Sequence, residues 1–384
     1  MILNWGELIT LEYGKPVKDK EATDGKVPVY GTNGQIGTSH LPAQCKHPSF
    51  ILGRKGAYRG VHYSDCPFSV IDTAFYAEPL TDRIDLKWAY YKFLTYDING
   101  MDSGSAIPST DRYQIYSIEV EVPPLEKQRK IVAVLDCIDR KININQKVND
   151  NLEQQAQAIF KEWFIENPEN NEWSTGTFSE LIKTTLNGDW GKEAPIGNNA
   201  EKVYCIRGAD IPEVKAGNKG KMPTRYILPK NFVTKQLTAG DIVVEISGGS
   251  PTQSTGRCTA ITQSLLDRYD SGMVCTNFCK AIKPKEGYSL FIYYYWQYLY
   301  SKGIFFSYEN GTTGIKNLDF SGFIETETIL IPPVDKVIAF DDYCKSIFNQ
   351  IFANGKQNEH LAVLRDTLLP KLMSGEIDVS DIQL

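Results

Sequence analysis

The feature that most limits the fold of this chain is a structural corner that occurs twice. A β-branched run, EVEV, turns through Pro123-Pro124 into a long helical pattern, and 209 residues later ILI turns through Pro332-Pro333 into another. Proline is well placed at the start of a helix, where its missing N–H would have had no partner. The repeat therefore predicts a chain built as domain, helix, domain, helix.

Both helical patterns carry the same heptad seam of mostly apolar residues spaced alternately four and three apart. The first helix is expected from about residue 125 to 166, roughly 60 Å at ~1.5 Å per residue. In the second helix, Pro370 is expected to kink or end the last turns. The first seam comprises Ile131, Leu135, Ile138, Ile142, Asn145, Asn149, Leu152, Ala156, Ile159 and Trp163; the second comprises Phe340, Cys344, Ile347, Ile351, Asn354, Asn358, Leu361, Arg365, Leu368 and Leu372.

The middle of each seam holds two asparagines, Asn145 with Asn149 and Asn354 with Asn358. The asparagines meet whether the helices run parallel or antiparallel, so the seam alone does not choose the direction. The chain connectivity favours antiparallel helices. A buried asparagine costs stability but fixes register, and we expect these four residues to set the register of a spacer. The alternative is that they face solvent.

The regions ahead of the two helices also resemble each other, with strand-like runs separated by glycine-rich turns. They predict an α/β (α+β) fold: two strand-rich globular domains separated by two long antiparallel helices, with an internal pseudo-two-fold repeat. Aromatic helical patterns at 86–96 and 289–303 are expected to pack on the sheets as core. The predicted parts are residues 1–122, the first helix at 123–168, residues 169–331, and the second helix with its tail at 332–384.

Four segments resemble the specificity subunits of type I restriction–modification systems: SGSAIPSTDRY (103–113), EVEVPPLEKQRKIVAVLDCID (119–139), NLEQQAQAIFKEWF (151–164) and HLAVLRDTLLPKLMSGEI (360–377). The resemblance implies a cytoplasmic, non-catalytic protein that recognises a bipartite double-stranded DNA sequence. Each half would be read by one target recognition domain. The helices would dock methylation subunits, two in number, and restriction subunits would join the complex. Methylation and translocation would belong to those partners.

Sequence motifs for chemistry are consistent with that expectation. The chain has no G-x-x-x-x-G-K-[ST] loop, and its double prolines read VPPL and IPPV, unlike the tetrapeptide of an adenine methyltransferase. The four histidines show no metal spacing, and the eight scattered cysteines are expected to be buried free thiols in a reducing cytoplasm. We expect no catalytic residues, no cofactor and no metal. Two alternatives stay open: a standalone methyltransferase or nuclease with unrecognised catalytic residues, and an adaptor that binds only proteins.

A net charge of −6 argues against a continuous coat of nucleic acid and directs attention to local loops. In the first domain three loops combine cations, amides, hydroxyls and glycines, the groups that approach phosphates and read base edges. The predicted DNA-binding residues there are Asn33, Gln35, Arg54, Lys55, Tyr58, Arg59, Ser105, Ser109, Thr110 and Arg112.

In the second domain the loops at corresponding places are GGSPTQSTGRC and ENGTTGIKN. Arg207 is a further candidate, although an ion pair with Asp210 explains it equally well. The predicted DNA-binding residues of this domain are Thr252, Gln253, Arg257, Thr312, Thr313, Lys316 and Asn317.

Overall fold

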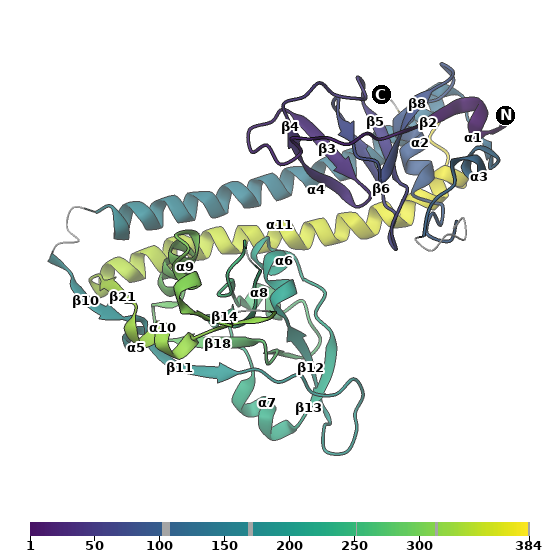
Figure 1. Ribbon diagram of the computed structural model, residues 1–384. Coiled ribbons are helices and arrows are strands. Elements are labelled where there is room, and N and C mark those ends of the chain that lie inside the picture. Colours follow the sequence, from purple (N-terminus) through teal and green to yellow (C-terminus); the bar gives the residue numbers. More distant parts are fainter. Residues whose placement is uncertain (102–107, 168–171, 251, 312–313, 383–384) are drawn as a thin grey trace. The chain divides into compact units, whose positions relative to one another are not determined.

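The computed structural model describes residues 1–101, 108–167, 172–250, 252–311 and 314–382 (Figure 1). By its internal contacts the chain forms two compact units, one of residues 1–140 with 361–384 and one of residues 141–360. Each unit therefore contains one strand-rich region and one stretch of both long helices. The four-part division drawn from the sequence stays a prediction.

Within residues 1–101 and 108–122, the first strand-rich region combines short strands with three helices. In chain order these are β1 Ile2–Asn4, α1 Trp5–Leu8, β2 Ile9–Tyr13, β3 Val27–Gly31, β4 Gly34–Ser39, β5 Ser49–Gly53, β6 Val61–Ser64, β7 Ser69–Val70, β8 Ala74–Pro79, α2 Leu86–Phe93, α3 Arg112–Tyr116 and β9 Glu119–Glu121.

The second strand-rich region contains the same kinds of element with several insertions. In order these are β10 Ser174–Thr177, α5 Phe178–Leu181, β11 Ile182–Asn187, β12 Glu201–Ile206, η3 Gly208–Asp210, α6 Ile211–Lys215, β13 Thr224–Ile227, α7 Pro229–Lys235, β14 Ile242–Glu245, β15 Ser247–Gly248, β16 Cys258–Ala260, α8 Gln263–Leu266, β17 Gly272–Cys275, β18 Cys279–Pro284, α9 Ser289–Ser301, η4 Ile304–Tyr308, β19 Glu309–Asn310, β20 Lys316–Leu318, α10 Phe320–Thr326 and β21 Thr328–Ile331.

Among the described residues, each of the three sheets of the first unit has a counterpart in the second unit, which also contains the small sheet β15-β20-β19. The antiparallel sheet β2-β8-β5-β6 of the first unit corresponds to β11-β18-β14-β16 of the second. The sheet β4-β3-β7 corresponds to β13-β12-β17, and in each one pairing is parallel. Two-stranded β1-β9 corresponds to β10-β21. The internal repeat expected from the helices therefore extends through both strand-rich regions, and the predicted mixed fold is confirmed.

Local sequence explains how each repeat begins. Asn4 with Glu7, and Thr177 with Glu180, form capping boxes that satisfy the first backbone N–H groups of α1 and α5. Strand pairing then sets β1 beside β9 and β10 beside β21, the strands that lead into the double prolines.

The prolines lead directly into the long helices, α4 Leu125–Phe160 and α11 Val334–Ser374. The carbonyl oxygens of Pro124 and Pro333 accept hydrogen bonds from the amides of Gln128 and Val337 at 3.1 and 3.3 Å. The buried Gln128 side chain also donates to the carbonyl oxygens of Arg83 and Pro123, at 2.8 and 2.9 Å. Gln128 thus secures the helix start inside its own unit.

The helix lengths agree closely with the sequence pattern. A short π-helix, η1 Lys161–Ile165, extends α4 to the predicted end. Of the kink or helix end expected at Pro370, the end does not occur there, because α11 continues through Pro370 to Ser374. Pro370 is exposed, so its ring lies toward solvent and the helix persists for one further turn.

The asparagines form buried layers within the second unit, where α4 and α11 run antiparallel. Asn145 Nδ2 donates to Asn358 Oδ1 at 2.8 Å, and Asn354 Nδ2 donates to Asn149 Oδ1 at 2.8 Å. All four side chains are buried. The antiparallel expectation holds here, and the solvent-facing alternative is wrong.

One asparagine also ties the helix pair to the strand-rich region. Asn149 Nδ2 donates to the carbonyl oxygens of Ile351 and Ala216, at 3.0 and 3.1 Å. Nearby, the backbone of α11 lies very close to the segment that follows α6: a Cβ on Gly355 would lie 1.9 Å from the carbonyl oxygen of Gly217. A side chain at position 355 would therefore force the region after α6 away from α11.

In the first unit the polar exception in the seam, Arg365, is paired. Its Nη1 donates to Asp139 Oδ1 at 3.0 Å, and the other Asp139 oxygen accepts from the Tyr91 hydroxyl at 2.7 Å. Ile131, Leu135 and Leu372 join the same apolar core as α2. The seam in this unit is thus apolar except for Arg365, whose charge is paired with that of Asp139.

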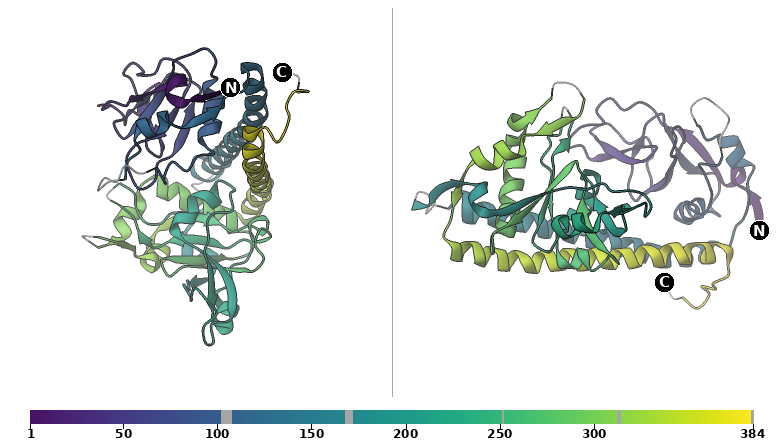
Figure 2. Two further views of the ribbon diagram at one scale, coloured as in Figure 1. Left: turned by 90° about the vertical axis from the view of Figure 1, so that its right-hand side faces the viewer. Right: turned by 90° about the horizontal axis from the view of Figure 1, so that it is seen from below.

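The aromatic helical patterns are core, as predicted. In the second unit α9 lies between the sheet and the long helices (Figures 1 and 2). Tyr294 packs against Phe160 of α4, and Tyr293 against Phe348 of α11. In the first unit Trp88 and Phe93 of α2 contact Trp5.

The asparagine layer predicts a matched pair of stability effects. Asn149→Ala removes the partner of Asn354 Nδ2 and of two carbonyl oxygens, so it should lower the free energy of unfolding by about 1–3 kcal/mol. Asn143→Ala, at an exposed position of the same helix, should change it by less than ~0.5 kcal/mol. Urea unfolding followed by circular dichroism measures both, and equal effects would contradict the layer's role.

Candidate nucleic-acid interface

Three loops that the sequence singled out separately meet in the first unit. Lys55 forms an isolated antiparallel bridge with Ser109, and the amide of Thr110 donates to the Arg54 carbonyl oxygen at 2.9 Å. Thr32 Oγ1 donates to the carbonyl oxygen of Lys55 at 2.9 Å. The ends of β5 and β3 and the segment ahead of α3 therefore build one composite surface.

Two of the predicted arginines converge on one tyrosine. The guanidinium carbons of Arg54 and Arg112 each lie 4.8 Å from the ring centroid of Tyr13, at the end of β2. Tyr13 is 44% exposed, and Arg112 also lies 5.1 Å from the exposed Tyr113 ring. Paired guanidinium groups on aromatic faces give a cationic surface suited to phosphates and base edges. No sequence pattern points to Tyr13, because it lies about 40 residues before Arg54 and about 100 before Arg112.

The remaining candidates of this unit divide by exposure. Asn33, Gln35, Lys55 and Tyr58 are exposed, and Ser109 is half-buried. Thr110 is buried, and Ser105 lies outside the described residues.

Arg59 requires a correction. It is 2% exposed, and its Nη2 donates to the carbonyl oxygens of Ile98 and Asn99 at 3.2 and 2.7 Å. The chain packs so tightly here that a Cβ on Gly53 would lie 2.8 Å from the Arg59 Cα. Arg59 therefore supports the turn from inside, and its placement contradicts direct contact with DNA. The motif GRKGAYRG does not reveal which arginine points inward.

The second unit brings together its two predicted loops in the same way. Strand β15, just beyond β14, pairs with β20, so Ser247 faces Asn317 and Gly248 faces Lys316. Gly249 has a φ of 73°, a conformation that favours glycine. The end of β14 thus corresponds to the end of β5, and β20 corresponds to the segment at Ser109 and Thr110.

Glu309 joins the two loops through a buried carboxylate. Its Oε1 accepts from the Thr255 amide at 2.6 Å, and its Oε2 pairs with Lys316 Nζ at 2.7 Å. Burial alone would raise the pKa of Glu309, but the hydrogen bonds from Lys316 and Thr255 outweigh it and lower the pKa. Lys316, a predicted DNA contact, is therefore held by an internal partner.

The two candidate arginines of this unit are also paired within it. Arg257 forms a two-point ion pair with Glu245, at 2.8 and 2.7 Å, and Arg207 does the same with Asp210, at 2.8 and 3.0 Å. The ion-pair explanation for Arg207 is correct. Thr252, Gln253 and Asn317 are exposed, whereas Thr312 and Thr313 lie outside the described residues.

A cavity of about 440 Å³ lies beside these loops, and the sequence did not identify its aromatic residues. Phe278 is 58% exposed, and Trp190 stacks on the Arg225 guanidinium with 4.0 Å between group and ring centroid. The walls of the cavity are largely apolar. Its two charged side chains are Glu245, which pairs with Arg257, and Arg207, which pairs with Asp210. The lining consists of Trp190, Arg207, Gly208, Ala209, Glu245, Ser247, Gly248, Thr276, Asn277, Phe278 and Ile315.

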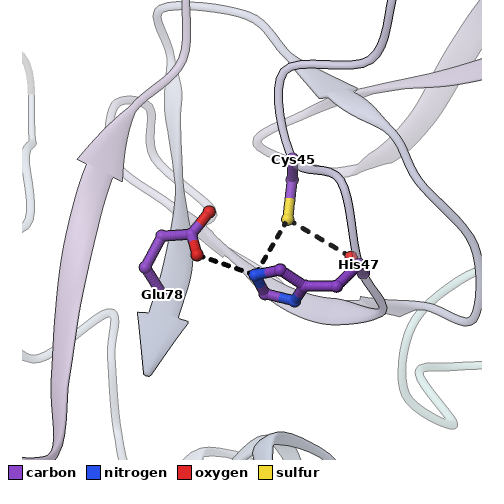
Figure 3. A group of neighbouring side chains, drawn as sticks. All are labelled: Cys45, His47 and Glu78. Carbon is purple, nitrogen blue, oxygen red and sulfur yellow. Dashed lines mark hydrogen bonds and ion pairs between the residues drawn. The ribbon is translucent and has the colours of Figure 1, made fainter. Parts of the chain in front are cut away.

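The cysteines and histidines differ in part from expectation. All eight cysteines are free thiols, as predicted, but Cys66 and Cys137 are exposed. Cys45, His47 and Glu78 form a group that could hold a metal ion, the one such group of three within the part of the chain that the structure describes (Figure 3). Sequence spacing missed it because Glu78 lies on a strand 31 residues beyond His47. Among the described helices none is long and apolar enough to cross a membrane.

Comparison with known proteins gives consistent matches. Residues 4–154 match the family model of the type I restriction modification DNA specificity domain. The MjaIX specificity subunit of Methanocaldococcus jannaschii is 26% identical over 331 residues, covering 78% of this chain and 71% of that protein. The HindI specificity subunit of Haemophilus influenzae is 24% identical over 353 residues, covering 75% and 74%.

A solved structure has a similar fold. The S subunit of a type I restriction–modification system from M. genitalium superposes with a TM-score of 0.55 at 17% identity. The match covers 97% of this chain and 95% of that one.

The geometry at Glu309 predicts a pH-dependent contribution to stability. Since its folded pKa is lowered, the carboxylate stabilises the fold above its ordinary pKa of 4.5, and that contribution is lost as the pH falls through the folded value. Glu309→Gln should be less stable than the wild type at pH 7, and the difference should shrink below about pH 4.5. Thermal unfolding across pH 3–7 tests this, with Glu325→Gln, exposed on α10, expected to follow the wild type throughout.

Proposed function

Because the chain belongs to the specificity subunits of type I restriction–modification systems, we propose that its two strand-rich regions each read one half of a bipartite DNA target. The observation that carries this proposal is the equivalence of two loop pairs. Each pair forms where corresponding strands, β5 and β14, leave corresponding sheets. Two copies of one reading surface suit two half-sites, as in dimeric DNA-binding proteins.

The two surfaces differ in whether their cationic side chains are paired with carboxylates of the chain. In the first unit Arg54 and Arg112 lie over Tyr13, and Lys55 is exposed, so this surface supplies phosphate contacts and a guanidinium for guanine. In the second unit Arg257 and Lys316 are paired with carboxylates, so base reading would fall to the exposed Thr252, Gln253 and Asn317 and the apolar rim at Phe278. We therefore expect different half-site sequences.

The partners would be DNA, methylation subunits and restriction subunits. Apolar residues stand exposed on the long helices, Ile144 on α4 and Ile338 and Val363 on α11, and we assign them to docking of the methylation subunits, two per chain. Methylation of adenine and DNA translocation would be carried out by those partners, and this chain would supply recognition.

The experiment that tests this function is mapping of methylated adenines in cells that express the chain with its methylation and restriction subunits. One bipartite motif with a fixed gap is expected. Exchange of residues 1–122 for those of another specificity subunit should change one half of the motif only. A single undivided motif would contradict the two-reader proposal and favour symmetric protein binding.

We expect Arg54 to contribute directly to affinity for DNA. Arg54→Ala should weaken binding of the complex with methylation subunits by about tenfold or more, in line with the ~1–3 kcal/mol of a good base contact. Arg54→Lys keeps the charge but loses the planar guanidinium group, so its affinity for DNA should lie between those of the wild type and Arg54→Ala. Arg83→Ala, in the turn before α2, should bind as the wild type; fluorescence anisotropy at fixed salt measures all three. Equal affinities would exclude Arg54 from the interface.

The helices would also act as a ruler for the gap between half-sites. Because α4 pairs antiparallel with α11, one heptad must be inserted in both, between residues 140 and 141 and between 360 and 361, so that the asparagine layers and the Asp139–Arg365 pair both keep their register. Seven residues add roughly 10 Å, so the preferred gap should lengthen by about three base pairs. Insertion in α4 alone should destabilise the protein, because the asparagine layers and the Asp139–Arg365 pair can then no longer form together. Methylome mapping of the double insertion reads the gap, and an unchanged gap would refute the ruler.

A further inference from the structure

A compact group of three potential metal ligands lies in the first unit, apart from the loops just described (Figure 3). Cys45 and His47 come from the connection between β4 and β5, and Glu78 from the end of β8. Their ligand atoms, one from each side chain, all lie within 4.8 Å of one another. Figure 3 shows the imidazole between the thiol and the carboxylate.

One imidazole nitrogen faces both of the other side chains. His47 Nε2 lies 2.7 Å from Glu78 Oε2 and 3.9 Å from Cys45 Sγ. The second nitrogen, Nδ1, lies 3.0 Å from the carbonyl oxygen of Pro48. If Nδ1 donates to that carbonyl, Nε2 presents its lone pair to a carboxylate oxygen and a sulfur. Without a metal, a proton on Nε2 satisfies the contact with Glu78, and the Cys45 thiol donates to the His47 carbonyl oxygen at 3.3 Å. A divalent cation can replace both protons and bind the three atoms together.

This arrangement matches the usual support of a metal-bound histidine. In metal sites the nitrogen that does not bind the metal commonly donates to a backbone carbonyl or a carboxylate, which fixes the ring. A Cys–His–Glu catalytic relay would instead need the thiol and the carboxylate on different ring nitrogens. Since both lie at Nε2, the geometry favours a metal centre over a nucleophile.

The three residues are held by rigid backbone. The Cys45 amide donates to the Phe68 carbonyl oxygen at 3.0 Å, and the Phe68 amide donates to the Cys45 carbonyl oxygen at 3.1 Å. Ser49 Oγ, two residues beyond His47, donates to the Ala77 carbonyl oxygen at 2.6 Å, next to Glu78. The ligands are therefore positioned before any ion arrives, which lowers the entropic cost of binding.

We propose that Cys45, His47 and Glu78 bind a zinc ion, with water as the fourth ligand. Thiolate, imidazole and carboxylate are the donor types that zinc takes in four-coordinate sites. For metal–ligand bonds of about 2.0–2.3 Å, the nitrogen–oxygen separation must widen by about half an ångström, a small rotation of the Glu78 side chain. The His47 and Glu78 side chains are 37% and 33% exposed, so water can reach the ion.

The ion would serve a structural role. Cys45 belongs to a small apolar cluster with Ile51, Phe68 and Val70, and zinc would join the β4–β5 connection to β8 beside that cluster. On binding, the thiol proton leaves to solvent and the sulfur bonds to the metal, with no change of oxidation state. The unfolded chain does not assemble the three ligands, so the ion stabilises the folded domain.

Cobalt(II) substitution tests the site in the purified full-length chain, kept with its methylation subunits. After chelation and dialysis, one equivalent of cobalt should give a thiolate-to-metal charge-transfer band in the near ultraviolet, and zinc should displace it. Cys45→Ser should lose the band. Cys66→Ser, which removes an exposed cysteine outside the group, should keep it. Glu78→Gln should keep the band and weaken the metal affinity at least about tenfold.

A second measurement separates metal binding from folding. Zinc should raise the unfolding temperature of the wild type and of Cys66→Ser but not that of Cys45→Ser or His47→Gln. Absence of the band, or a band that persists in Cys45→Ser, would overturn the proposal and leave a simple His47–Glu78 ion pair. These outcomes are independent of methylome mapping, so either proposal can fail alone.

Discussion

The register of α4 against α11 is the constraint on which the second unit depends most. Burying four amide side chains in an apolar seam is unfavourable unless each amide forms a hydrogen bond. Only one antiparallel alignment places Asn145 opposite Asn358 and Asn149 opposite Asn354, so that both hydrogen bonds form. A shift of one turn would keep at most one asparagine pair and leave the other two amides among apolar residues. The layer thus excludes alternative registers that an all-leucine seam would tolerate.

The same layer connects the helices to the surface that we assign to DNA. Asn149 donates to Ala216, and Gly355 lets the chain at Gly217 lie against α11. Register, docking of the strand-rich region and placement of its loops are therefore linked by direct contacts. A substitution in the seam can alter recognition without touching a base.

Duplication explains both the common plan and the difference between the two reading surfaces. The sheets and corners are equivalent because the same strand pairings bury the same apolar faces in each copy. The loops bury no such apolar face, so their sequences can differ between the two copies. In one copy two half-buried arginines, Arg54 and Arg112, lie over the exposed ring of Tyr13, and in the other Arg257 and Lys316 are paired with carboxylates.

The sequence by itself determined the duplicated plan, the two helix starts, the heptad seam and the loops at strand ends. These follow from local periodicity, proline and glycine stereochemistry, which act over a few residues. Only the tertiary structure decided that Arg59 lies buried while Arg54 reaches Tyr13, and that Glu309 neutralises Lys316. It also assembled Cys45, His47 and Glu78 from different parts of the chain. Such outcomes depend on packing and strand pairing between residues distant in sequence, and no local pattern encodes them.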